Sequence, residues 1–355
     1  MRVKCLFVAA VLVAMPSLAV AAVVDTDDLT IDIYASFEFE YQLDDEGNGD
    51  PNASFDSDQI DIVFNLKKDN FRIGADVVLE HGVATEDGRG NVGLSFGFAE
   101  YAASEKFKLR VGKYLTPYGI HNPLNSYKSG FHSVKIPLAT NKPDKLSGDG
   151  FRFFPRRQVG IAILGTLPAG DRTLDYDVLL TNGDQEETNP FEEDNNSQKA
   201  LSARVVYEAT DELRVGLSSH LDSVDEGGER RSLSSVSAHA QYDARKVRFW
   251  TEVTMGELEG PAGAPDVDQL GGFVEFSYLF KDSVAPYIQY QYLETQAAID
   301  QSADLWIAGA SFRFKKYAVI KLENAYVSGS RDNEEFEDIA SRDYSEIRAA
   351  VVLGF

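Results

Sequence analysis

The sequence predicts an all-β protein, a transmembrane antiparallel up-and-down β-barrel of about 16 strands. Three observations support this class. Apolar and polar residues alternate with a period of two in run after run along the chain. The connections between these runs are alternately short and long. After the amino-terminal segment, no stretch approaches the roughly 18 consecutive apolar residues that a membrane-spanning helix requires.

Residues 1–21 have the features of a cleaved secretory signal peptide. Arg2 and Lys4 precede the apolar run 5–15, and the small residues Ala19 and Ala21 follow it. A membrane anchor is the alternative, but the apolar run is too short to span a bilayer. The one cysteine lies in this segment, so no disulfide or cysteine-metal site is expected in residues 22–355.

Composition and charge limit the possible partners of residues 22–355, which we interpret as a single barrel domain. The chain has 57 acidic and 34 basic residues and a formal net charge of -23. Because nucleic-acid binding requires a basic surface, we expect no nucleic-acid partner. The 28 glycines and 11% aromatic residues are typical of an exported β-protein.

Each expected strand has one apolar face and one polar face. In the first run, Ile31, Ile33 and Phe37 alternate with Asp32 and Glu38. The first eight runs have apolar faces within 31–41, 60–66, 71–79, 92–98, 107–111, 159–163, 174–180 and 201–207. The next eight lie within 213–221, 236–242, 247–253, 270–280, 284–292, 306–314, 318–326 and 347–355.

These amphipathic runs favour a membrane barrel over a soluble sandwich. In a bilayer every backbone donor and acceptor must pair within the protein, so strands can cross only as a closed cylinder. The apolar face would contact lipid and the polar face would line water. Side chains cannot fill a ring of about 16 strands, so we expect a channel.

The connections are consistent with two different rims. Short turns are expected at 67–70, 104–105, 168–171, 210–211, 243–245, 281–282 and 315–316. Long polar connections are expected at 43–58, 84–90, 117–155, 183–198, 223–231, 259–267, 295–301 and 330–341. Membrane barrels have short periplasmic turns and long extracellular loops, which predicts this alternation.

The connection 117–155 is the longest and the only strongly basic one. It contains 5 of the 12 prolines of the chain, and its aromatic residues argue against disorder. We interpret it as a constriction loop in the pore, where positive side chains would contact anions. The candidates are Lys128, Lys135, Lys142, Lys145, Arg152, Arg156 and Arg157.

The polar strand faces provide a second set of cations. This expected basic ladder along the lumen comprises Lys108, Arg110, Arg204, Arg214, Arg248, Arg313 and Arg348, and the same parity adds Arg72 and Lys321. The same faces also have carboxylates, including Asp61, Asp76, Glu252, Glu275, Glu323 and Glu346. The set is compatible with a mild anion preference, or with a mixed lumen of weak selectivity or cation preference.

Two motifs resemble known families. Residues 111–119, VGKYLTPYG, with Gly112, Pro117 and Gly119, and the later Thr-Asn-Gly at 181–183, resemble the phosphate-selective porin O and P family. The last strand, which ends on Phe355, is similar to the terminal strand of bacterial outer-membrane proteins.

The resemblance implies the outer membrane of a Gram-negative bacterium, a homotrimer of sixteen-stranded barrels, and a loop folded into each pore. It implies that Phe355 is read by the barrel-assembly machinery. It also implies contact with outer-membrane lipid and lipopolysaccharide, and passage of small anions, phosphate among them, or hydrophilic solutes. The anion-binding lysine cluster of that family has no residue-by-residue counterpart in this chain.

Several alternatives stay open at this stage. The acidic connections 43–58, 183–198 and 330–341 suit either divalent cations that bridge lipopolysaccharide or a solvated outer face. His121 and His132 lie in the constriction loop and are either pH-sensitive or ordinary polar residues. No cofactor, metal site or catalytic set is expected. The expected function is therefore a non-enzymatic porin, with a plugged structural or adhesive barrel or an outer-membrane hydrolase as alternatives.

Overall fold

The structure is a computed structural model. It describes residues 23–26, 29–45, 52–80, 91–124, 130–143, 146, 150–183, 198–226, 229–280, 283–297, 300–315, 318–331 and 344–354. The expected signal peptide, Lys128, Lys145, Phe355, part of connection 43–58 and most of connections 183–198 and 330–341 lie outside the described residues.

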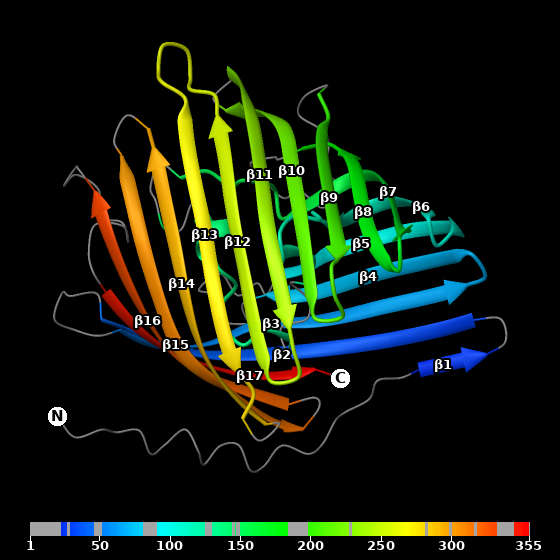
Figure 1. Ribbon diagram of the computed structural model, residues 1–355, viewed down its shortest axis with the longest axis horizontal. Coiled ribbons are helices and arrows are strands. Elements are labelled where there is room, and N and C mark those ends of the chain that lie inside the picture. The colour runs from blue at the N-terminus through cyan, green and yellow to red at the C-terminus, as the bar shows by residue number, and fades with distance from the viewer. Residues whose placement is uncertain are drawn as a thin grey trace.

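Sixteen long strands pair antiparallel around a ring (Figure 1). In the first half these are β2 (Leu29–Asp45), β3 (Asn52–Lys68), β4 (Phe71–Glu80), β5 (Asn91–Ser104), β6 (Phe107–Leu115), β7 (Arg157–Ala169), β8 (Arg172–Thr181) and β9 (Ala200–Glu208). In the second half they are β10 (Leu213–Glu226), β11 (Glu229–Asp243), β12 (Val247–Leu258), β13 (Val267–Tyr278), β14 (Val284–Gln296), β15 (Gln301–Lys315), β16 (Ala318–Arg331) and β17 (Tyr344–Gly354).

The ring includes every strand from β2 to β17. Consecutive strands pair with each other, β9 with β10 among them, and β17 pairs with β2 from Ser345↔Asp45 to Gly354↔Ser36. The predicted up-and-down arrangement of about 16 strands is therefore confirmed. An additional short strand, β1 (Val23–Thr26), pairs with the start of β2 and was not expected from the sequence.

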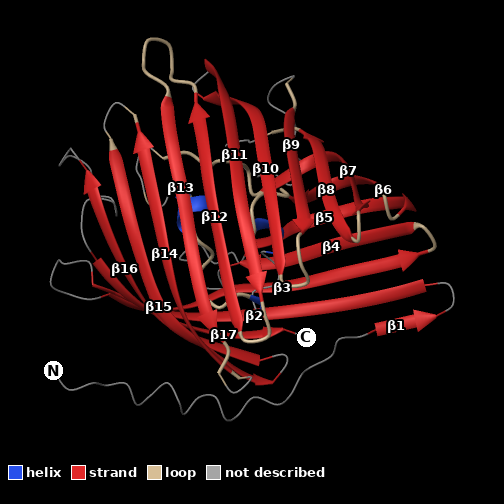
Figure 2. Cartoon of the chain, in the orientation of Figure 1, coloured by secondary structure: helices blue, strands red, loops and turns tan. Residues whose placement is uncertain are grey.

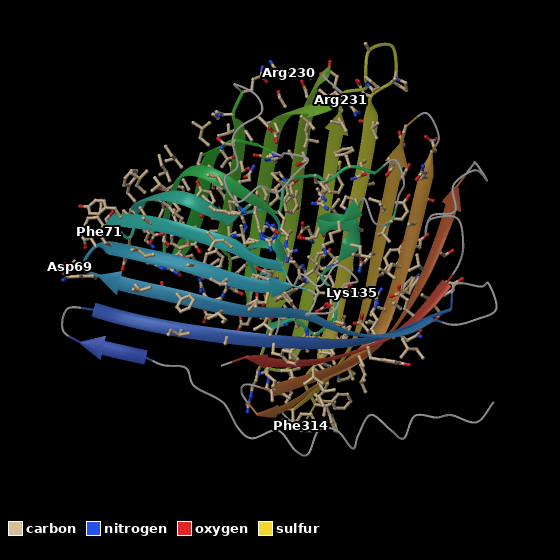
Figure 3. All side chains as sticks on the ribbon, turned by 180° about the vertical axis from the view of Figure 1, so that it is seen from behind. Asp69, Phe71, Lys135, Arg230, Arg231 and Phe314 are labelled. Atoms are coloured by element: carbon tan, nitrogen blue, oxygen red, sulfur yellow. The ribbon has the colours of Figure 1, made fainter. Side chains whose placement is uncertain are left out.

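Side-chain alternation follows the period-two pattern. Large apolar side chains point outward, as shown by exposed fractions of 62% for Phe71, 60% for Leu217 and 65% for Phe314. Polar residues such as Ser202 and Gln269 occupy the buried inward positions between them. Figure 3 shows Phe71 and Phe314 near the ends of strands at the short-turn rim, where lipid-facing aromatic residues are typical of membrane barrels.

The expectation that Phe96 and Phe98 share the lipid-facing side of Leu94 is wrong. The pairing of β4 with β5 shifts register between Asp76 and Val77, because an extra residue is accommodated at Ser95. Such a bulge reverses the side to which the following residues point. Leu94 is exposed, whereas Phe98 is buried and both Phe96 and Phe98 line an internal cavity.

The predicted long connection 223–231 is mostly strand. β10 and β11 continue to pair from Ser223↔Ser232 to Glu226↔Glu229. β2 and β3 likewise continue into the expected connection 43–58, as far as Asp44↔Asn52. At the β10–β11 end most of these residues are polar, so an amphipathic pattern does not reveal the strands there. Figure 3 shows Arg230 and Arg231 at the end of the β10–β11 hairpin, at the top of the view, with Phe314 at the bottom.

The segment 116–156 joins β6 to β7 and contains the two short helices of the described structure. These are the 3-10 helix η2 (Asn122–Leu124) and the helix α1 (Leu138–Asn141). Figure 2 shows the helices enclosed by the strands. Within the described residues, no helix is long and apolar enough to cross a membrane.

Candidate functional site

The two ends of segment 116–156 are tied to each other at the barrel wall. The backbone N–H of Thr116 donates to the carbonyl oxygen of Arg156 at 3.1 Å. The side-chain amide of Asn122 donates to the carbonyls of Thr116 at 2.7 Å and Arg156 at 3.0 Å. The loop therefore leaves and re-enters the wall at one point, and the rest of its described part extends into the interior.

The first corner of the loop is fixed on Glu252 of β12. Gly119 has a φ of 58°, in the left-handed region that glycine favours. A Cβ on Gly119 would lie 2.2 Å from Oε1 of Glu252. The N–H of Ile120 donates to Oε2 of Glu252 at 2.9 Å, and Arg204 of β9 donates to the Gly119 carbonyl at 3.1 Å. Gly119 is thus required by both its backbone conformation and its close approach to the wall.

The described part of the loop is held by inward side chains of β10 to β16. Their shared role is to satisfy loop backbone groups that would otherwise be buried without partners. These hydrogen bonds include Gly119 N–H to Ser218 at 3.1 Å, Val134 N–H to Glu323 at 2.8 Å, Lys321 to the Ser133 carbonyl at 2.8 Å, Ala139 N–H to Gln291 at 3.2 Å, and Phe151 N–H to Gln269 at 3.1 Å.

Aromatic packing reinforces this contact with the wall. The rings of Tyr118 and Phe154 stack with centroids 4.2 Å apart. Tyr118, Phe151, Phe153 and Phe154 form a buried cluster with Leu233 of β11. The loop therefore packs along one side of the barrel, the side formed by β10 to β16.

In this packing His121 is buried and His132 is half-buried. The His121 ring lies 5.0 Å from Phe273 and 5.1 Å from Phe131 between ring centroids. Burial, with a smaller contribution from Arg248, lowers the pKa of His121 to about 3. Burial also lowers the pKa of His132 to about 3, assisted by Arg248, Lys321 and Arg313. Both histidines are neutral near pH 7, so the structure gives no support to a histidine switch around neutral pH.

The opposite side of the barrel encloses a cavity of about 410 Å³. Arg72 of β4, Arg110 of β6 and Arg204 of β9 line it, and Pro117 and Pro123 contribute the loop side. The other lining residues are Val63, Phe64, Asn65, Gly74, Phe96, Phe98, Tyr114, Leu115 and Asp177. Asp177 is the one carboxylate among these lining residues, so the cavity wall is predominantly cationic.

Two of these arginines are oriented by their neighbours. Nη2 of Arg110 lies 2.6 Å from Oε2 of Glu100, and the Arg110 guanidinium stands 4.1 Å from the centroid of the Phe98 ring. Nε of Arg72 donates to Asn65 at 2.6 Å, and its guanidinium lies 5.4 Å from the same ring. These contacts hold the charged groups at the cavity wall instead of leaving them free to rotate.

Other members of the expected basic ladder are spread around the ring. Arg248 contacts Asp243 at 2.8 Å and donates to the Gly130 carbonyl at 2.9 Å. Arg348 is buried between Glu323 and Glu346. Arg214 lies 3.9 Å from Glu208 near a short turn. Lys108 is half-buried on β6 and Arg313 is exposed near the end of β15.

The described basic residues of the loop region are also dispersed. Arg157 begins β7 and donates to Ser95 at 3.3 Å. Lys135, Lys142 and Arg156 are half-buried, and Arg152 is exposed. Figure 3 shows Lys135 within the space enclosed by the strands. None of these loop residues lines the cavity, so their predicted contact with anions stays a prediction.

One arrangement resembles a hydrolytic triad. Oγ of Ser202 lies 2.9 Å from Nδ1 of His220, and Nε2 of His220 lies 3.5 Å from Asp222. Ser202 and His220 both have an exposed fraction of 0%, and the Ser202 hydroxyl donates to Gln158 at 3.1 Å. A nucleophile must reach its substrate, so this group is structural in the observed state. Among the described residues, no group of His, Cys, Asp or Glu is arranged to hold a metal.

Sequence reasoning missed the polar residues that anchor the loop. Ser218, Ser235, Gln269 and Gln291 were not singled out, although period-two parity places each on an inward face. The period-two alternation was the available signal, but it does not distinguish these residues from any other inward-facing residue. Nothing local in the sequence identifies which wall the loop contacts.

Comparison with known proteins agrees with this architecture. A family model described as Gram-negative porin matches residues 8–332. The chain belongs to the Gram-negative porin family. It is accordingly a protein of the outer membrane of a Gram-negative bacterium and forms an outer-membrane channel. Membership in this family favours a non-enzymatic channel over a hydrolase.

Solved structures share the fold of this porin at low sequence identity. An anion-selective porin from Comamonas acidovorans matches with a TM-score of 0.69 and 12% identity, over 92% of this chain and 100% of that one. The channel DcaP of Acinetobacter baumannii gives 0.65 and 10%, over 95% and 100%. OmpT of Vibrio cholerae gives 0.64 and 16%, over 94% and 100%. No curated protein sequence matches the porin.

Proposed function

We propose that this porin is a water-filled channel for passive diffusion of ions and small hydrophilic solutes, with a mild anion preference. The observation that carries the preference is the cavity wall, where Arg72, Arg110 and Arg204 face one lining carboxylate, Asp177. Low-dielectric walls strengthen the field of such charges at a narrow point. The Comamonas acidovorans protein of similar fold is an anion-selective porin, which supports the same preference.

The loop 117–155 is proposed as the constriction. Its described part packs against the inward side chains of β10 to β16, so it narrows the lumen from that side. Passage would follow the side formed by β3 to β9, past Pro117 and Pro123. In this arrangement the strand arginines contact the solute more directly than the loop lysines do.

Phosphate is the finer proposal, and it rests on the resemblance of residues 111–119 to phosphate-selective porins. Arginine pairs well with phosphate oxygens, so the cavity chemistry is compatible with it. Phosphate added to a chloride-conducting channel would then reduce the chloride current at low millimolar concentration. A current unaffected by phosphate would remove phosphate preference and leave general anion preference intact.

A homotrimer is proposed as the assembly, because Vibrio cholerae OmpT, which shares the fold, has a trimer form. Contact with lipopolysaccharide and recognition of Phe355 by the barrel-assembly machinery are proposed with it. The exposed apolar belt accounts for the lipid contact. Multi-angle light scattering of detergent-purified protein, corrected for detergent, distinguishes a trimer from a monomer.

Planar-bilayer recording tests the channel and its selectivity together. A porin gives stepwise conductance, and its reversal potential in a KCl gradient has the sign of chloride permeation. Arg72→Gln should move the reversal potential toward cation permeation. Arg72 hydrogen-bonds neutral Asn65, so the substitution leaves no carboxylate without its ion-pair partner. Arg214→Gln, with the same charge change outside the cavity lining, is the matched control.

The same recording decides between the channel and a plugged structural or adhesive barrel. A plugged barrel inserts without conductance steps. Cation-dominated current in the unmodified protein would overturn the anion preference, and an Arg72→Gln variant indistinguishable from Arg214→Gln would overturn the assignment to this cavity.

A further inference from the structure

The cavity beside the loop combines fixed cations with aromatic and aliphatic side chains. Phe96, Phe98, Val63 and Leu115 line it together with the three arginines. A channel that only selects by charge has no use for aromatic lining at the same point. A binding site for an organic ligand typically has this composition, with apolar walls and a few placed polar groups.

The position of the Phe98 ring depends on the absence of a side chain at Gly74. A Cβ on Gly74 would lie 2.5 Å from the tip of the ring, so the ring packs directly against the backbone of β4. Phe96 stacks beside it with centroids 5.8 Å apart, and Arg110 covers it at 4.1 Å. Because Arg110 covers Phe98, which is largely buried, the flat surfaces on which a ligand ring stacks favourably are mainly those of Phe96 and the guanidinium.

The charges of the site are not equally compensated. Glu100 forms an ion pair with Arg110, and Asp177 is the cross-strand partner of Arg204. Glu100 also lies opposite Arg72 in the pairing of β4 with β5. Within the described structure, however, the side chain of Arg72 donates its hydrogen bond to neutral Asn65. Arg72 is therefore the cation that has charge and hydrogen-bond donors left for a ligand.

Resting on the proposed anion-preferring channel, we propose that this cavity is a binding subsite for small organic carboxylates with a flat apolar body, such as aromatic carboxylates. The carboxylate pairs with Arg72 and the ring packs against Phe96, Phe98 and the Arg110 guanidinium. An inorganic anion would use the charge alone and leave most of the cavity of about 410 Å³ to water.

Isothermal titration calorimetry on the detergent-purified full-length porin tests the subsite. Benzoate is the probe, acetate supplies the charge without the ring, and benzyl alcohol supplies the ring without the charge. We expect benzoate to bind at least about tenfold more tightly than either, since both contacts contribute. Arg72→Gln and Phe98→Leu should each weaken benzoate binding about tenfold, and Arg214→Gln should leave it unchanged.

The outcome is separable from the proposed function. Benzoate that binds no better than acetate, or that binds Arg72→Gln as well as the unmodified protein, overturns the subsite. An anion-selective current in bilayers would stand in that case. If the bilayers show no current, the channel fails, and calorimetry still decides the subsite, because equilibrium binding needs no conduction. Because Phe98 also packs in a buried cluster, Arg72→Gln is the deciding variant if Phe98→Leu does not fold.

Discussion

Substituting Gly119 by alanine should release the loop from the wall. The added Cβ would lie 2.2 Å from Oε1 of Glu252, so the carboxylate must move away. Its movement breaks the 2.9 Å hydrogen bond from the Ile120 N–H. The backbone is also strained, because φ at this position is 58° and alanine disfavours the left-handed region.

These two effects set the size of the change. A left-handed alanine costs about 1–2 kcal/mol. Loss of a hydrogen bond to a charged acceptor costs about 1.5–3 kcal/mol. The docked loop of Gly119→Ala should therefore be destabilised by roughly 2.5–5 kcal/mol, which raises the undocked fraction by about two orders of magnitude or more.

Two assays detect this change. Bilayer recordings of Gly119→Ala should show more frequent current fluctuations, since an undocked loop moves within the lumen. Trypsin should cut the loop faster at Lys135 or Arg152, which lie between Gly119 and the return to β7. The barrel itself should stay folded, as checked by its heat-dependent shift on a denaturing gel.

Gly170→Ala is the matched control. Gly170 has a φ of 71°, but a Cβ there would meet no atom within 4 Å. It occupies the short turn between β7 and β8, so it shares the backbone strain without the contact to the loop. Fluctuations and trypsin cleavage of folded Gly119→Ala that match those of Gly170→Ala would refute the docking argument.

Three further predictions concern the same contacts. Docking should weaken as pH falls from about 6.5 toward 3, because an undocked His121 takes up a proton at its ordinary pKa of about 6.5 while burial lowers the docked pKa to about 3. Channel noise should thus be low at pH 7.5 and higher at pH 4.5. His121→Phe should reduce this rise in noise. A noise level independent of pH would contradict the prediction. Gln269→Leu should increase loop cleavage by trypsin, because it leaves the N–H and carbonyl of Phe151 unpaired at a cost of about 1–3 kcal/mol each. Gly112→Ala should lower the yield of folded barrel, since a Cβ would lie 2.3 Å from the Gly97 carbonyl, whereas Gly93→Ala on β5 meets nothing within 4 Å and should fold normally.

The sequence predicted the barrel because lipid imposes a regular pattern on strands that cross it. Outward residues such as Leu217 and Phe314 must be apolar, and this requirement recurs at every second position. The pattern fails where lipid is absent. The β10–β11 hairpin extends through Ser223 and Ser232 beyond the apolar belt, and there the sequence resembles an ordinary polar loop.

A single inserted residue produced the other error. Ser95 adds one residue to β5, and the side of Phe96 and Phe98 reverses with it. Sequence alternation alone cannot distinguish an aromatic residue that faces lipid from one that faces the lumen after a bulge. The register with the partner strand determines which side such a residue faces, and this register is known only from the pairing of β4 with β5.

The loop contacts depend on residues far apart in the chain. Ile120 and Glu252 are separated by 132 positions, and Val134 and Glu323 by 189. Parity places Glu252 and Glu323 inside the barrel, but it places Asp61 and Glu346 there as well. Which inward carboxylate accepts a loop N–H depends on the folded path of the loop, and local sequence does not encode that path in a recognisable motif.

The side of the barrel against which the loop packs determines which basic residues are left to contact a solute. The sequence interpretation assigned anion contact mainly to the loop lysines, since the loop is the basic segment of an acidic chain. In the structure the loop uses the polar groups of β10 to β16 for its own backbone, as Glu252 and Gln269 show. The wall it leaves free contains Arg72 and Arg110, and Arg204, which also donates to the Gly119 carbonyl, lines the same cavity. A basic loop can thus determine selectivity indirectly, because by covering carboxylates on one wall it leaves the solute to contact arginines on the other.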